Sequence, residues 1–114
     1  MTDNALPLDG IRIIDFTWVF AGPYATMLLG SLGAEVIKIE GHIRTDLTRH
    51  GVLWRLADPA PVLIPPNQAM SFNTLNMNKK SVTLDMSRPE GRDLAKRLIS
   101  MSDVVVDNFR AGAM

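Results

Sequence analysis

The chain is expected to adopt an α/β fold with an open, mostly parallel sheet, because apolar strand-like runs alternate with helix-like segments along its 114 residues. Two apolar runs, at 11–16 and 34–40, enclose one helix-like segment. An alternating run at 81–86 and an apolar run at 103–109 enclose an amphipathic one. Two such units in succession are typical of a parallel sheet with helices on its faces.

The first unit consists of a strand, a tight turn, a short helix and a second strand. The isoleucine-rich run at 11–16 predicts a buried strand, and residues 17–22 form the predicted turn. A helix is expected from Pro23 to Leu32, because proline fits the first helical turn. Gly33 is the expected helix stop before the strand at 34–40. A right-handed crossover follows from this βαβ order.

The second unit follows a segment of different character. Residues 41–70 hold both histidines and most of the prolines, and predict a long irregular excursion. After the strand at 81–86, a helix is expected at 87–102, with Ser87 and Glu90 at the spacing of a capping box. The strand at 103–109 has no covering helix after it, which is unusual for a buried parallel strand. We therefore expect residues 1–114 to be one partial domain of a longer protein.

Composition excludes several classes of function. Lysine plus arginine and aspartate plus glutamate both number 12, so no basic surplus indicates a nucleic-acid partner. Cysteine is absent, which excludes disulfides and thiol nucleophiles in these residues. The polar N-terminus is unlike a signal peptide, and no apolar run approaches the roughly 20 residues that cross a bilayer. We expect a cytoplasmic protein with no nucleic-acid or membrane partner.

Candidate ligand contacts fall where predicted strands end, because open α/β sheets bind ligands beyond the carboxyl ends of their strands. Small Ala21 and Gly22 let a ligand approach backbone N–H groups at a helix start. Asn108 can donate and accept hydrogen bonds, and Phe109 can stack on a ring. From spacing alone, a tight connection after the first strand and a plain turn after the last remain the alternatives.

Other polar residues carry weaker signals. Lys79 and Lys80 could meet phosphates, but a solvated turn that protects a sheet edge is the favoured interpretation. His42 and His50 are too few for a metal site, so no metal is expected. No nucleophile is placed beside a base, and no catalytic residue is assigned. The residues themselves predict a domain for a nucleotide-like ligand.

Four stretches, in order, carry a family resemblance: PLDGIRIIDFTWVFAGPYATMLLGSLGAEVIKIE, TDLTR, LNMNKKSVTLDMSRPEGRDLAKRLI and SDVVVDNFRAG. Together they resemble the family III CoA-transferases, which include formyl-CoA transferase, carnitine CoA-transferase and α-methylacyl-CoA racemase. The resemblance runs from about Leu6 to Met114. It implies a Rossmann-like fold, as the N-terminal part of the large CoA-binding domain. Coenzyme A is then a cosubstrate, with no permanently bound cofactor.

The resemblance also implies a set of CoA-binding positions. By their match to the family's segments these are Phe20, Ala21, Leu84, Asp85, Met86, Ser87, Asn108, Phe109 and Arg110. Gly41 stands where formyl-CoA transferase has an arginine near the nucleotide, and Arg44 or His42 is the candidate substitute. Met77, Lys80 and Ala111 also depart from the family pattern.

The implied chemistry moves CoA from an acyl-CoA to a small carboxylic acid. An aspartate attacks the thioester to give a mixed anhydride and then an enzyme–CoA thioester. In the family this aspartate lies beyond position 114, so residues 1–114 alone are expected to be inactive, and an interlocked homodimer is implied for the parent. The alternatives are a 2-methylacyl-CoA racemase of the same family and a non-catalytic CoA- or nucleotide-binding module.

Overall fold

Four parallel strands and their connecting helices make up the computed structural model, which describes residues 5–50, 65 and 67–113. In chain order the elements are β1 (Arg12–Asp15), α1 (Ala21–Ser31), β2 (Glu35–Glu40), the 3₁₀ helix η1 (Leu47–His50), α3 (Met70–Leu75), β3 (Lys79–Thr83), α4 (Pro89–Ser100) and β4 (Val104–Val106). The sheet order is β3-β2-β1-β4, with all pairs parallel. The predicted α/β fold is confirmed.

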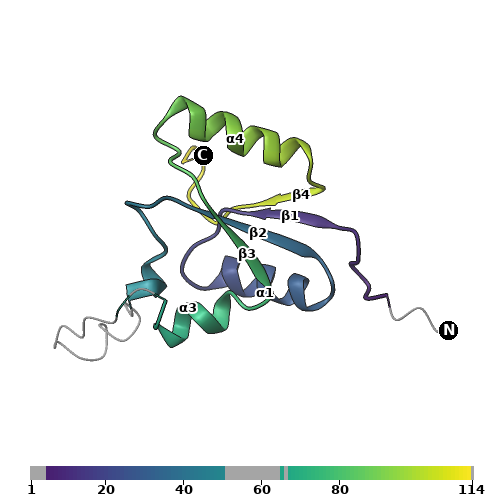
Figure 1. Ribbon diagram of the computed structural model, residues 1–114. Helices are drawn as coiled ribbons and strands as arrows, with labels where there is room; N and C mark the ends of the chain where they lie inside the picture. Colours follow the sequence, from purple (N-terminus) through teal and green to yellow (C-terminus); the bar gives the residue numbers. More distant parts are fainter. Residues whose placement is uncertain (1–4, 51–64, 66, 114) are drawn as a thin grey trace.

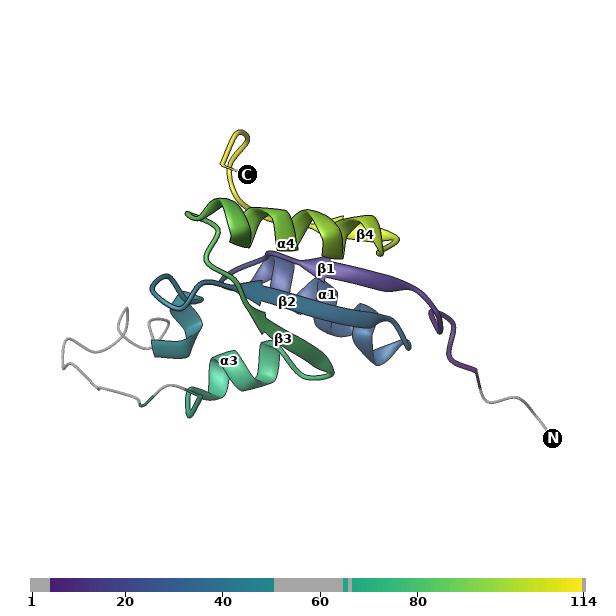
Figure 2. The ribbon, with the colours of Figure 1, turned by 45° about the horizontal axis from the view of Figure 1, so that its top comes forward.

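Helices cover both faces of the sheet. α4 lies over one face, and α1 with α3 lies under the other (Figures 1 and 2). Successive residues of a strand point to opposite faces. Accordingly Ile14 packs with Ala95 of α4, whereas Ile13 packs with Val36 on the opposite face. This alternation explains why β1 is apolar at consecutive positions and buried on both sides.

Two glycines let helices approach the backbone closely at the carboxyl edge of the sheet. A Cβ on Gly22 would lie 2.4 Å from the Cβ of Thr17, so α1 begins directly against the turn that follows β1. A Cβ on Gly91 would lie 2.0 Å from the carbonyl oxygen of Asp85, so α4 begins directly against the segment that follows β3. No side chain fits at either contact, and glycine is the residue that permits both.

Several predicted boundaries differ from the structure. α1 begins at Ala21 rather than Pro23, and β3 spans Lys79–Thr83 rather than 81–86. β4 is the three-residue strand Val104–Val106, shorter than the predicted 103–109. The excursion at 41–70 contains η1, while α3, which has no counterpart in the prediction, begins at Met70. The remainder of the excursion, at 51–64 and 66, lies outside the described residues.

The predicted capping box is wrong. α4 starts at Pro89 with Arg88 as its N-cap, and no side chain caps it. The Ser87 hydroxyl instead donates to Asp85 Oδ1 at 2.6 Å. Proline needs no backbone partner for its nitrogen, so the helix begins there without the serine.

In the part of the chain that the structure describes, no helix combines the length and apolar character that crossing a bilayer requires.

Candidate ligand-binding site

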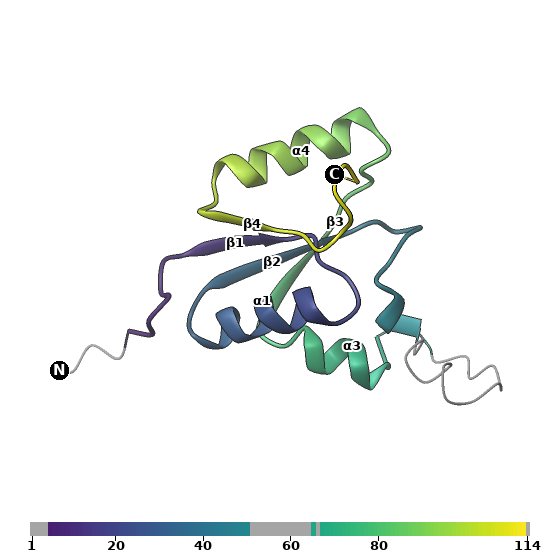
Figure 3. The ribbon, with the colours of Figure 1, turned by 180° about the vertical axis from the view of Figure 1, so that it is seen from behind.

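A pocket of about 650 Å³ opens at the carboxyl edge of the sheet. The segments that follow the four strands contribute its lining. The carboxyl ends of the strands lie on the side of the molecule away from the described N-terminus (Figure 3). The segment Gly41–Arg44, after β2, forms one wall, and residues 84–87, after β3, form another. Phe16, Trp18 and Phe109 close it from the β1 and β4 side.

Five of the nine predicted site residues line this pocket: Leu84, Asp85, Met86, Ser87 and Phe109. The other four do not line it, although all follow carboxyl strand ends: Phe20, Ala21, Asn108 and Arg110. Phe20 is 56% exposed and stacks with Tyr24 of α1, at 6.3 Å between ring centroids. Sequence reasoning missed Trp18 and Ile43, whose only signal was their place soon after strand ends.

The side chain of Asn108 forms hydrogen bonds with the protein backbone and does not line the pocket. Its Nδ2 donates to the Trp18 carbonyl at 2.8 Å, and its Oδ1 accepts from the Trp18 N–H at 2.9 Å. The Trp18 ring then meets the Phe109 ring edge-on, with centroids 5.4 Å apart and planes inclined at 70°. The two aromatic rings of this wall are thus fixed relative to each other by Asn108.

The wall after β3 presents an ionised carboxylate. Asp85 Oδ1 accepts from the Ser87 hydroxyl at 2.6 Å and from the Ser87 N–H at 3.0 Å. These two hydrogen bonds hold the pKa of Asp85 below its ordinary value. Such a carboxylate can accept hydrogen bonds from ligand hydroxyl groups.

The wall after β2 presents positive charge. His42 and Arg44 are exposed and both line the pocket. Gly41 lies against this segment, since a Cβ there would be 3.3 Å from the Arg44 carbonyl oxygen. Within the described residues, no group of three or more acidic or histidine side chains is arranged to hold a metal.

Buried ion pairs lie next to the pocket. Lys79 Nζ is 2.9 Å from Asp15 Oδ2, and Lys38 Nζ is 3.2 Å from Asp46 Oδ2. Arg49 Nη2 is 2.6 Å from Glu40 Oε1, and the Arg49 guanidinium lies 3.7 Å from the Phe72 ring centroid. The first pair links β3 to β1 within the sheet, and the other two link β2 to the segment that follows it. Within the described residues no buried side-chain polar atom lacks a partner.

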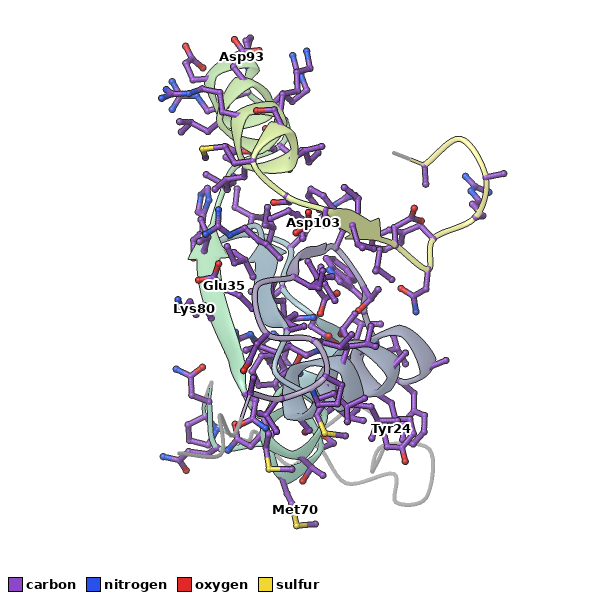
Figure 4. All side chains as sticks on the ribbon, turned by 90° about the vertical axis from the view of Figure 1, so that its right-hand side faces the viewer. Tyr24, Glu35, Met70, Lys80, Asp93 and Asp103 are labelled. Carbon is purple, nitrogen blue, oxygen red and sulfur yellow. The ribbon has the colours of Figure 1, made fainter. Side chains whose placement is uncertain are left out.

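The interpretation of Lys79 as part of a solvated turn is wrong. Its side chain is 2% exposed and also donates to the Pro23 carbonyl and to Asn76 Oδ1. Burial lowers the pKa of Lys79, and the Asp15 carboxylate opposes that shift. Lys80 matches the prediction, because its exposed side chain lies on the outermost described strand and pairs with Glu35 (Figure 4).

Burial would raise the pKa of Asp15, but its hydrogen-bond donors reverse that effect. Thr17 Oγ1 donates to Asp15 Oδ1 at 2.5 Å, and Thr26 Oγ1 donates to Oδ2 at 2.6 Å. With Lys79 they hold the pKa of Asp15 below its ordinary value. Asp15 is therefore an ionised structural carboxylate beneath the turn that enters α1.

A parallel sheet with helices on both faces and a pocket beyond its strand ends defines an open α/β domain whose candidate ligand site lies at the carboxyl edge of the sheet. The model for CoA-transferase family III matches residues 8–114 of the chain. The chain belongs to that family.

Relatives agree with this assignment. Formyl-CoA:oxalate CoA-transferase from Escherichia coli is 42% identical over 108 residues, which cover 95% of this chain and 24% of the relative. A CaiB/BaiF family protein from Brucella suis matches in structure with a TM-score of 0.76 and 35% identity, covering 95% of this chain and 27% of that one. Rv3272 from Mycobacterium tuberculosis has a TM-score of 0.76 and 40% identity, with coverage of 96% and 28%. The chain thus spans about a quarter of the length of these relatives.

Proposed function

We propose that residues 1–114 form the CoA-binding part of an acyl-CoA:carboxylate CoA-transferase. The observation that carries the proposal is the pocket at the carboxyl edge of the sheet, in a chain of CoA-transferase family III. Its walls combine aromatic rings, positive charge and an ionised carboxylate. A ligand with a flat base, phosphates and sugar hydroxyls would use all three.

Each part of coenzyme A has a matching surface in the pocket. The apolar side chains Phe16, Ile39 and Leu84 suit the adenine ring. Arg44 and His42 are placed to meet phosphate oxygens, which supports them as substitutes for the arginine missing at Gly41. Asp85 can accept from ribose hydroxyl groups.

The reaction that we propose for the parent protein is carboxylate nucleophilic catalysis. An aspartate outside these residues attacks the acyl-CoA carbonyl, the carbon–sulfur bond breaks, and CoA thiolate leaves a mixed anhydride. The thiolate then attacks the aspartyl carbonyl and releases the first acid. The acceptor carboxylate attacks this enzyme thioester and expels CoA thiolate, which gives a second mixed anhydride. The thiolate then attacks the acyl carbon of the acceptor, forms the new acyl-CoA and releases the aspartate carboxylate. Residues 1–114 supply binding and no nucleophile, in a cytoplasmic enzyme that assembles as an interlocked homodimer.

A titration of CoA into the protein that carries this chain tests the proposal. We expect Phe109→Ala to weaken CoA binding roughly tenfold, because it removes from the pocket wall an aromatic side chain whose burial against a ligand contributes about 1.5–3 kcal/mol. Met101→Ala is the matched control, since Met101 is exposed at the opposite edge of the sheet, where its carbonyl accepts from Arg12. Equal CoA affinity in both variants and the wild type would count against the pocket.

A second assay separates the reaction types. The parent protein is incubated with acyl-CoA and a labelled carboxylic acid, and transfer of CoA to the acid is followed. We expect transfer of CoA without exchange of the α-proton of the acyl group. Exchange of that proton without transfer would indicate the racemase reaction, and CoA binding with neither reaction would indicate a binding module.

A further inference from the structure

The backbone of the turn between β1 and α1 forms hydrogen bonds with side chains of residues outside the turn. The Thr17 N–H donates to Asp15 Oδ1 at 2.8 Å, and the Thr17 carbonyl accepts from Lys38 Nζ at 2.6 Å. Both backbone groups of Trp18 are engaged by Asn108. Four backbone groups in succession therefore take their partners from side chains on β1, β2 and the segment after β4.

The next residue, Val19, has an unfavourable backbone conformation. Its φ is 72°, in the left-handed region that β-branched residues rarely adopt. The Val19 N–H donates to Asp46 Oδ1 at 3.2 Å. Strain of this kind persists only where surrounding contacts over-determine the conformation, and it is concentrated at binding and catalytic sites.

Several hydrogen bonds fix the position of the Asp46 carboxylate that accepts from Val19. Its carboxylate is completely buried and accepts from Lys38 Nζ at 3.2 Å, from the Thr48 N–H at 3.0 Å and from the Thr48 hydroxyl at 2.8 Å, besides Val19. The Asp46 N–H donates to Glu40 Oε2 at 2.9 Å. The pocket wall Gly41–Arg44 lies between Glu40 and Asp46 in the chain, so Asp46 helps to fix this wall. Through Val19, Asp46 also contacts the turn that carries Trp18 in the wall on the β1 and β4 side.

We propose that Asp46 and Asn108 are positioning residues that clamp a strained turn and thereby set the Trp18 wall of the pocket. Asn108 grips the backbone of Trp18 itself, and Asp46 holds Val19 in the left-handed conformation that directs Trp18 toward Phe109. The proposal deepens the proposed function and rests on it where the ligand is CoA. Neither residue needs to touch the ligand for this role.

A double-mutant cycle between Asp46→Asn and Val19→Gly tests the clamp in the protein that carries this chain. Glycine adopts positive φ without strain, so in Val19→Gly no outside contact is needed to keep this conformation. The variant should bind CoA with an affinity within about threefold of the wild type. Asp46→Asn alone should weaken CoA binding about tenfold. An amide has a single acceptor oxygen, and when this oxygen faces the Lys38 ammonium its NH₂ group faces the Val19 N–H. The valine then loses its acceptor and leaves its left-handed conformation. In the Val19→Gly background, the same Asp46→Asn change should weaken it no more than about threefold.

Two results would overturn the proposal. One is an equal loss of affinity in both backgrounds, which would show that Asp46 acts through general stability or direct contact. The other is no loss in either background. Glu35→Gln is the control for removing an acidic group, since Glu35 lies at the opposite edge of the sheet in an exposed pair with Lys80, and it should leave affinity unchanged.

Asp46→Asn leaves the Lys38 ammonium buried without its charged partner, and the variant can fail to fold. In that case the cycle is run with Asn108→Ala, whose side chain is exposed and leaves no buried charge. A smaller loss of CoA affinity in the Val19→Gly background again supports the clamp, and an equal loss overturns it.

Trp18 fluorescence, obtained by subtracting the spectrum of Trp18→Phe, reads the position of the ring without any ligand. We expect Asp46→Asn or Asn108→Ala to increase quenching of Trp18 by acrylamide, and Val19→Gly to suppress the increase. If CoA fails to bind the wild type while this fluorescence pattern appears, the proposed function fails and the clamp stands. If CoA binds and Trp18 quenching is unchanged in every variant, the clamp fails alone.

Discussion

The two faces of the sheet are stabilised by different interactions. The face toward α4 is closed by the apolar side chains of Ile14, Phe16, Ile39 and Ala95. The face toward α1 and α3 has an apolar end at Ile13 and Val36, but near the carboxyl edge it buries charged residues. These are Asp15, Lys38 and Lys79, with Asp46 and Glu40 beside them.

The positions of side chains are more tightly constrained on the face that buries charged residues. Apolar contacts are non-directional, so several side chains of similar volume can fill the α4 face. Buried ion pairs contribute little net stability, but removing one partner is strongly unfavourable, so they admit few alternative arrangements. The charged end of the face toward α1 and α3 lies under the Thr17–Phe20 turn, whereas the apolar face supports α4. Substitutions on the two faces should therefore have effects of different size.

The largest effect is expected on the charged face. Asp15→Asn should lower the free energy of unfolding by about 3–5 kcal/mol, because it leaves Lys79 buried without its counter-ion. The double variant Asp15→Asn/Lys79→Met should recover much of that loss, since no uncompensated charge remains. Urea unfolding at neutral pH measures both. A single variant as stable as the wild type would remove the contrast between the faces.

Acid should weaken the charged face in a defined direction. The folded-state pKa of Asp15 is below its unfolded value, because hydrogen bonds and Lys79 outweigh the effect of burial. Its contribution to stability is present above about pH 4, the ordinary aspartate pKa, and is lost as pH falls through the lowered folded-state value. Urea midpoints measured from neutral to acid pH should fall less steeply in Asp15→Asn/Lys79→Met than in the wild type. Equal slopes would contradict the role given to Asp15.

A smaller effect is expected on the apolar face. Ile14→Val should lower the free energy of unfolding by about 0.5–1.5 kcal/mol, because it deletes one buried methylene and leaves every polar contact intact. CoA affinity should not change with it. A loss of affinity as large as that of Asp46→Asn would show that both faces position the site.

The smallest effect is expected at the exposed pairs on the amino edge. Glu35 pairs with Arg12 and Lys80, and each of these side chains is partly or largely exposed to solvent. Glu35→Gln should leave the urea midpoint within measurement error, since exposed ion pairs are screened by water. A clear destabilisation would mean that these pairs stabilise the sheet as the buried ones do.

Sequence patterns predicted the strands at positions where apolar residues dominate. The runs around Ile13 and Val36 were assigned to the right strands. A ligand site was predicted at carboxyl strand ends, and the structure has a pocket at that edge of the sheet. α3 escaped prediction because its six residues carry too short a pattern to indicate a helix. The predicted capping box was wrong because the Ser87 hydroxyl donates a hydrogen bond to Asp85, and this contact depends on the conformation of the turn after β3.

The charged residues show most clearly what sequence patterns could not predict. Lys79 and Lys80 are adjacent and chemically identical in the sequence, yet one is buried against Asp15 and the other is exposed beside Glu35. Strand alternation sends them to opposite faces, and the register of β3 against β2, with Lys79 beside Val36 and Lys80 beside Ile37, decides which one is buried against Asp15. Asn108 likewise follows a strand end as predicted, but it does not line the pocket and instead bonds the backbone of Trp18, which is 90 residues away in sequence.

Apolar periodicity and local motifs predicted the order of the four strands, the helices α1 and α4, and the family, because these patterns are properties of neighbouring residues. Which charges are buried, which side chains face the pocket and what holds Val19 in its strained conformation were visible only in the folded molecule. These depend on groups brought together from β1, β2 and the segments after β2 and β4, and a hydrogen bond across the fold leaves no periodic trace along the chain.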